Sequence, residues 1–98
     1  MMEGELLFHL LTPLKEVASC RCETVNLIEK DGAEGRGGSL GIRRGHLPAV
    51  VALAENSAVS VKNQDKTVFS ARVRGGFARV DRESVTVLTP EAEVTLDI

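Results

Sequence analysis

Residues 58–74 read AVSVKNQDKTVFSARVR, and polar and apolar residues alternate on both sides of the centre of this stretch. In the second half, Phe69, Ala71 and Val73 share one face, and an alternation with period two indicates a half-buried β-strand. The centre, at 63–65, has the Asn-Gln-Asp composition of a turn. These residues therefore predict two β-strands joined by a turn.

The same pattern extends to both ends of the chain. Leu6, Phe8 and Leu10 share one face of a predicted strand that ends at the Leu-Thr-Pro triplet 11–13. A second such triplet at 88–90 looks accidental, because no repeat of longer period surrounds it. Further strands are predicted over 17–28 (one long strand or two joined ones), 39–42, 47–53, 77–80, 85–88 and 94–98. About nine or ten short strands with turn signals between them indicate an all-β fold, an antiparallel β-sandwich or flattened barrel.

Composition limits the classes of function. The chain has 98 residues and a formal charge of −2, with 43% hydrophobic residues, so residues 1–98 form one globular domain. Aromatic residues make up only 3%, and base stacking needs aromatic faces, so nucleic-acid binding is not expected. No apolar run approaches the roughly 18 residues of a membrane helix, and the acidic start is unlike a secretory signal. We therefore expect a protein that stays in the cytoplasm.

Cysteine and histidine side chains offer a second class of function. Cys20 and Cys22 lie on one face of a strand, about 6.6 Å apart at ~3.3 Å per residue, with parallel side chains that disfavour a disulfide. Two reduced thiols are therefore expected. Together with His9 and His46 they make a zinc or thiol protein arithmetically possible, although structural zinc ligands usually come in two closely spaced pairs.

A glycine-rich loop at 31–45 contains six of the nine glycines. Residues 37–41 spell G-x-S-x-G, but Gly45 and Pro48 stop the helix that a nucleophile elbow requires, so no catalytic residue is predicted. A dinucleotide fingerprint is also incomplete, so no cofactor is expected. The loop is locally basic, which fits either a solvated loop or a docking edge for an acidic or polar partner. His46, which has no partner for catalysis, is expected to bind backbone groups.

The order of these features resembles a known family. Residues 38–48, GSLGIRRGHLP, resemble the signature G-x-x-G-I-x-P-G-H-x-P of the F-type ATP synthase epsilon subunit. Residues 74–80, RGGFARV, resemble its Gly-Gly-Phe segment, and Thr12-Pro13 stands where the family often has Thr-Pro. The resemblance covers about residues 6–92.

The resemblance implies a ten-stranded β-sandwich that is not itself an enzyme. It would be a central-stalk (rotor) subunit that links the gamma subunit to the membrane c-ring and couples ion translocation to ATP synthesis or hydrolysis. Its place would be the F1 sector on the cytoplasmic side of the inner membrane, without metal, cofactor, nucleic acid or lipid insertion. The residues expected to bind the gamma subunit or the c-ring are Glu34, Arg36, Ser39, Arg43, Arg44 and His46. The structural motif comprises Gly41, Gly45, Pro48, Gly75, Gly76 and Phe77. If Phe77 is a core ring, its removal is expected to cost about 3–5 kcal/mol.

Three departures from the family pattern matter. Arg44 replaces the usual proline, which predicts a less rigid loop before Gly45. Ser39 stands where an acidic residue often meets the c-ring, which moves the expected contact towards Glu34, Arg36 and Arg43. The chain ends at Ile98, without the family's C-terminal helical hairpin. A freestanding small β-barrel that binds a peptide or small ligand is the alternative function.

Overall fold

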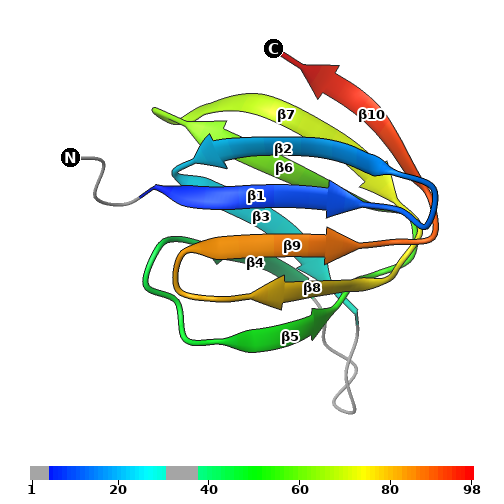
Figure 1. The fold of residues 1–98 in the computed structure, drawn as a ribbon, viewed down its shortest axis with the longest axis horizontal. Helices are drawn as coiled ribbons and strands as arrows, with labels where there is room; N and C mark the ends of the chain where they lie inside the picture. The colour runs from blue at the N-terminus through cyan, green and yellow to red at the C-terminus, as the bar shows by residue number, and fades with distance from the viewer. Residues whose placement is uncertain (1–4, 31–37) are drawn as a thin grey trace.

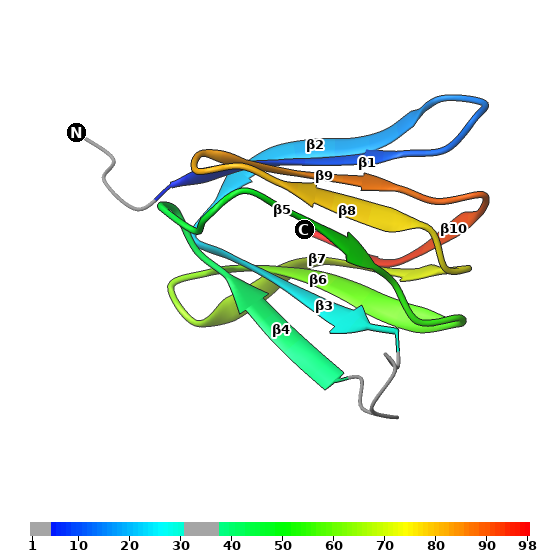
Figure 2. The same ribbon diagram turned by 90° about the horizontal axis from the view of Figure 1, so that it is seen from below.

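The computed structural model describes residues 5–30 and 38–98, which form ten β-strands and no helix. Two five-stranded sheets, in the orders β2-β1-β9-β8-β5 and β10-β7-β6-β3-β4, pack face to face as a sandwich (Figures 1 and 2). The strands are β1 (Leu6–Leu11), β2 (Glu16–Cys22), β3 (Thr24–Glu29), β4 (Gly38–Ile42), β5 (Ala49–Ala52), β6 (Ser57–Asn63), β7 (Lys66–Val73), β8 (Phe77–Val80), β9 (Ser84–Leu88) and β10 (Ala92–Asp97). The predicted all-β sandwich is confirmed.

The hairpin predicted from residues 58–74 is β6 and β7, which pair antiparallel from Ser57↔Val73 to Asn63↔Lys66. Gln64 and Asp65 form its turn with φ angles of 52° and 63°. Two successive residues with positive φ match the twist of the flanking strands, which is why such turns close tight hairpins. A register shift between Val61 and Lys62 follows the turn, and beyond it Val61 is opposite Phe69, with both side chains buried.

The core lies between the sheets and is built from the predicted inward faces. Phe8 in one sheet and Phe69 in the other are buried, and their ring centroids are 5.9 Å apart. Leu6, Leu10 and Val73 are also buried. Side chains at every second position thus meet across the sandwich, as the alternation requires.

One pair of strands differs from the antiparallel expectation. β1 and β9 pair in parallel, from Leu7↔Ser84 to Leu11↔Leu88. A parallel pair needs a long connection, and here the chain from β2 to β8 provides it. The Leu-Thr-Pro triplets 11–13 and 88–90 therefore leave the sheet side by side, and the Thr89 N–H donates to the Leu11 carbonyl over 3.1 Å. The similarity of the two triplets looked accidental in the sequence, but both follow the paired ends of β1 and β9 and lie next to each other.

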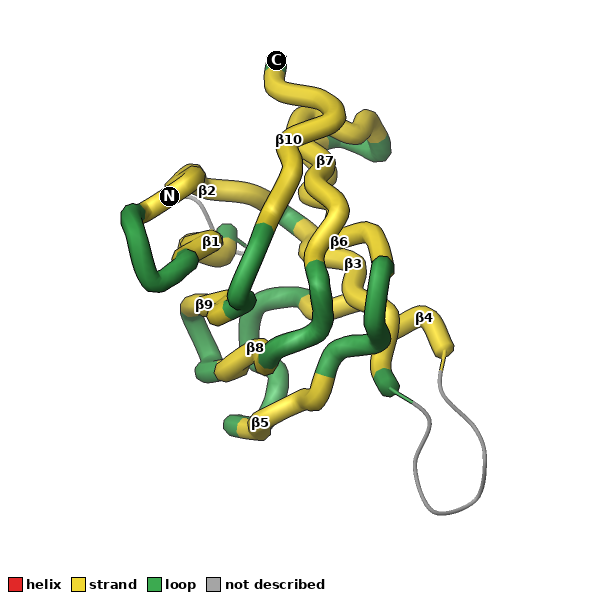
Figure 3. The backbone as a smooth tube through the Cα atoms, turned by 90° about the vertical axis from the view of Figure 1, so that its right-hand side faces the viewer, coloured by secondary structure: helices red, strands yellow, loops and turns green. Residues whose placement is uncertain are grey.

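The strands run along the sandwich, so the connections gather at its two ends (Figure 1), and Figure 3 looks onto the end on the right in Figure 1. The proline end, on the right in Figure 1, holds the connections 12–15, 53–56, 74–76 and 89–91. The arginine end, on the left, holds the connections 43–48, 64–65 and 81–83.

Candidate functional site

The arginine end contains the Gly-His part of the recognised motif. The His46 N–H donates to the Arg43 carbonyl over 3.2 Å, which closes a four-residue turn. Gly45, third in that turn, has a φ of +91°. Positive φ at the third position is typical of a type II turn and favours glycine, which is the residue at 45.

Arg44 holds the second position of this turn, where proline is favoured because its ring fixes φ. Other contacts fasten the loop instead. The Arg44 guanidinium donates to Glu83 Oε2 over 3.1 Å, and the Gly45 N–H donates to the Arg82 carbonyl over 2.7 Å. Both contacts tie the turn to the connection between β8 and β9. The rigidity that proline would supply locally is thus partly supplied by a neighbouring loop.

His46 has the backbone role expected of it. The ring is half-buried, and its Nδ1 donates to the Leu47 carbonyl over 2.7 Å. A carbonyl only accepts, so this hydrogen bond places the proton on Nδ1. Pro48 follows in the exposed segment before β5.

The predicted partner-binding residues do not form one cluster. Ser39 lies near the start of β4, opposite Ile28, whereas Arg43 follows its end. The exposed Ser39 side chain is therefore close to the proline end, and Arg43 and Arg44 are at the arginine end. Ser39 also lies within a strand, without the strand-to-helix turn of a nucleophile elbow. Glu34 and Arg36 lie outside the described residues.

The motif glycines allow close approach of the backbone. Gly41 lies in β4, where an added Cβ would come within 3.3 Å of Asn26 Oδ1. Gly75 and Gly76 have φ angles of +68° and +102° in the connection from β7 to β8. Positive φ at both positions favours glycine in this connection.

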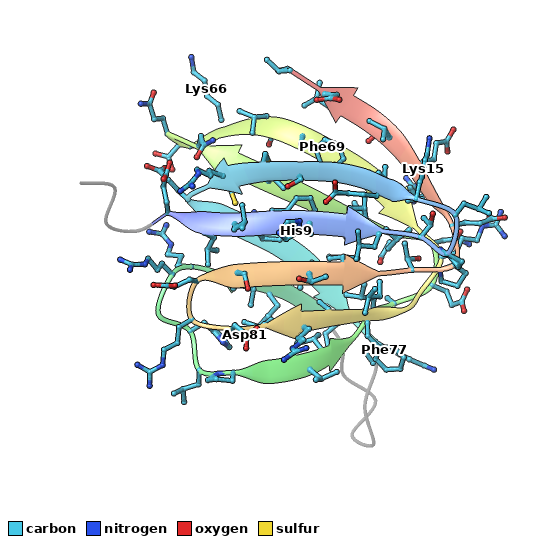
Figure 4. The ribbon with its side chains drawn as sticks, viewed as in Figure 1. His9, Lys15, Lys66, Phe69, Phe77 and Asp81 are labelled. Carbon is cyan, nitrogen blue, oxygen red and sulfur yellow. The ribbon has the colours of Figure 1, made fainter. Side chains whose placement is uncertain are left out.

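Phe77 is not a core ring, so the condition attached to the sequence-based expectation is not met. Its residue is 56% exposed, because β8 turns Ala78 and Val80 inward and therefore Phe77 outward. Figure 4 marks Phe77 where β8 begins, at the proline end.

Phe77 contributes to an apolar groove that sequence reasoning missed. Across the outer face of its sheet, Phe77 is opposite Leu88, and Leu88 is opposite Leu11. With the two Leu-Thr-Pro triplets and Gly76 they line a groove of about 410 Å³. The groove could not be found from the sequence, because the parallel pairing of β1 and β9 assembles it.

The polar groups of this groove are already satisfied. Thr89 Oγ1 donates to the Glu91 carbonyl over 3.0 Å, and Thr12 Oγ1 donates to the Lys15 carbonyl over 3.4 Å. The surface that remains is hydrocarbon. Because exposed apolar patches of this kind mark docking sites, the proline end suits an apolar side chain of a partner.

In the part of the chain that the structure describes, the side chains that could bind a metal ion are scattered. No three His, Cys, Asp or Glu side chains there are placed to hold a metal ion. His9 Nδ1 lies 3.2 Å from Glu16 Oε1 on the outer face of β1 and β2, far along the chain from His46. Residues 5–30 and 38–98 also contain no helix that could cross a bilayer.

Cys20 and Cys22 are free thiols on one face of β2, as predicted. Burial, followed by the charges of Cys20 and Glu5, raises the pKa of Cys22 to about 12. Burial, followed by the charge of Asp97, raises the pKa of Cys20. Both thiols are thus poor nucleophiles near neutral pH, because the thiolate is the reactive form.

The raised pKa of the Cys22 thiol predicts that the stability of the protein depends on pH. Above the ordinary thiol pKa of 9.0, the unfolded chain loses the Cys22 proton while the folded chain keeps it, so stability falls as pH rises towards 12. We expect the melting temperature to decline between pH 8.5 and pH 10.5. The Cys22→Ala variant is expected to start lower but to decline less steeply. If the melting temperatures of the parent chain and Cys22→Ala decline in parallel, Cys22 is not the source of the pH dependence.

A sandwich with an apolar groove at one end and charged, cross-tied loops at the other has the features of a protein-docking domain. Comparison with known families narrows this class. The model of the ATP synthase delta/epsilon chain β-sandwich domain matches residues 5–95, and the chain belongs to this family. The resemblance found in the sequence is confirmed.

Similar proteins agree with this assignment. The ATP synthase epsilon chains of Desulfatibacillum aliphaticivorans and Lawsonia intracellularis are each 34% identical over 97 residues, which is 99% of this chain. The match covers 64% of the first relative and 67% of the second, so the chain spans about two thirds of their length. A chain in the Euglena gracilis mitochondrial ATP synthase has the same fold, with a TM-score of 0.75 and 21% identity over 96% of this chain and 56% of that one.

Proposed function

We propose that this chain is a non-catalytic central-stalk subunit of an F-type ATP synthase. In this role it links the gamma subunit to the c-ring on the cytoplasmic side of the inner membrane and couples ion translocation to ATP synthesis or hydrolysis. The observation that carries the proposal is the presence of two surfaces of different chemistry at opposite ends of one sandwich. The apolar groove lies at the proline end and the Arg44–Glu83 ion pair at the arginine end.

A coupling subunit needs stiffness between its contacts, and the sandwich supports this. Its two sheets enclose one continuous core, in which Phe8, Leu27 and Val61 are fully buried. Close-packed interiors are barely compressible and transmit strain. Displacement at one end is therefore passed to the other without reactive groups. The proposed activity requires shape and contact only.

The test is recovery of partners from native membranes with a tagged chain. We expect the gamma and c-ring subunits to be recovered with the parent chain. Phe77→Asp places a charge in the apolar groove, and Gly45→Val strains the turn at the arginine end; each is expected to lower recovery of at least one partner by about tenfold. Ser39→Ala removes only an exposed hydroxyl, so recovery is expected to fall less for this variant than for Gly45→Val.

Melting temperatures of the purified variants separate loss of binding from loss of fold. Equal recovery of the gamma subunit by Gly45→Val and Ser39→Ala would count against a docking role for the arginine end. Recovery of the parent chain alone, as a monomer, would instead favour a freestanding binding module.

A further inference from the structure

On the outer face of the sheet that contains β3, β4 and β6, the Thr24 hydroxyl has one cationic side chain on each side. Thr24 pairs with Lys62 of β6, and Val25 pairs with Ile42 of β4, so Arg43 lies next to Thr24 on its other side. At about 4.8 Å between strands, the Cα atoms of Lys62 and Arg43 are about 10 Å apart. Both side chains are long enough to reach a small ligand held above Thr24.

A second row lies beside the first and leaves space. Asn26 pairs with Gly41 on one side and Ser60 on the other. Gly41 has no side chain, and a Cβ there would come within 3.3 Å of Asn26 Oδ1 and 4.0 Å of Thr24 Cγ2. Gly41, Thr24 and Asn26 are among the residues that line a surface hollow of about 590 Å³. That volume is within the range of small-ligand sites.

The donors around this hollow are unused among the described residues. Arg43 and Lys62 are exposed and form no ion pair there, and the side chains of Thr24 and Asn26 form no hydrogen bond there. Arg44 also lines the hollow, but its guanidinium is paired with Glu83. Two cations, a hydroxyl and an amide therefore surround the hollow, and none of these side chains has an interaction partner among the described residues.

Two carboxylates border the same hollow and limit its affinity. Glu23 Oε1 accepts the backbone N–H of Gln64 over 2.7 Å, which holds this carboxylate at the turn. Asp65 has no such partner among the described residues and is the competing anion. Removal of the Asp65 charge should therefore strengthen binding of an anion in the hollow.

We propose that this hollow is a binding site for a tetrahedral oxyanion of the phosphate class. Lys62 and Arg43 bind the oxygens from opposite sides, and the Thr24 hydroxyl and the Asn26 amide donate from the floor. Donors that approach from several directions suit a phosphate group better than a planar carboxylate, and guanidinium and ammonium groups are the usual phosphate partners. This site does not include the apolar groove, but it shares Arg43 and Arg44 with the turn at the arginine end.

The experiment is a titration of the ¹⁵N-labelled chain with inorganic phosphate at constant ionic strength, followed by amide chemical shifts. We expect saturable shifts at millimolar phosphate, largest at Thr24, Asn26 and Gly41, and weaker binding of acetate. Shifts that rise linearly without saturation would overturn the proposal. Acetate binding as tight as phosphate would overturn the assignment to a tetrahedral ligand.

Variants test the residues. The double substitution Arg43→Gln with Lys62→Gln is expected to weaken phosphate binding by about tenfold or more, whereas Asp65→Asn is expected to strengthen it. Arg79→Gln, which changes an exposed arginine on the other sheet, is the matched control and should bind phosphate unchanged. Unchanged core amide shifts confirm the fold. Equal affinity of the double variant and the parent would overturn the proposal, and no partner subunit is needed to see it.

Discussion

Replacement of Phe8 by alanine is expected to lower the free energy of unfolding by about 3–5 kcal/mol. Phe8 is 0% exposed, and its ring lies 5.9 Å from that of Phe69 in the facing sheet. The neighbouring strands β2 and β9 hold β1 on both edges, so the backbone cannot move in to fill the cavity. Because domains are stable by only about 5–15 kcal/mol, this loss is measurable as a large shift in the urea midpoint.

Phe77→Ala makes the same chemical change at an exposed position and is the matched control. Since Phe77 is 56% exposed, its replacement is expected to cost about 1 kcal/mol or less. Urea unfolding of both variants under one set of conditions gives the comparison. Similar losses of unfolding free energy for Phe8→Ala and Phe77→Ala would show that the Phe77 ring is packed and does not point outward from β8.

Gly76→Ala is expected to cost about 3 kcal/mol or more, because backbone strain and a steric clash act together. Gly76 has a φ of +102°, a conformation that side chains disfavour. An added Cβ would also overlap the carbonyl oxygen of Leu88. Leu88 cannot retreat easily, since it pairs with Phe77 on one side and Leu11 on the other.

Gly45→Ala separates the two contributions to this loss. Gly45 has a comparable φ of +91°, but an added Cβ there meets no atom within 4 Å. Backbone strain alone predicts a loss of about 1–2 kcal/mol. Thermal or urea unfolding of both variants measures the difference. If Gly45→Ala and Gly76→Ala lose equal unfolding free energy, the clash between the added Cβ and Leu88 does not contribute to the loss at Gly76.

Local patterns predicted the strands and the sides that they bury. Leu6, Phe8 and Leu10 alternate with outward residues, and burial of such a set depends only on period two within one strand. The same rule applied to β8 points Phe77 outward. The family motif marks Phe77 as important, but it does not state whether the side chain is in the core or on the surface.

Contacts between distant strands were beyond the reach of these patterns. The parallel pairing that joins Leu11 to Leu88, the distance of Ser39 from Arg43, and the row formed by Lys62, Thr24 and Arg43 all depend on which strands become neighbours. Neighbours are selected by how well whole sheets bury their inner faces together, and this is a property of the complete chain. Residues on the outer faces contribute little to that burial, so their own sequence carries no periodic signal of the surfaces that they form.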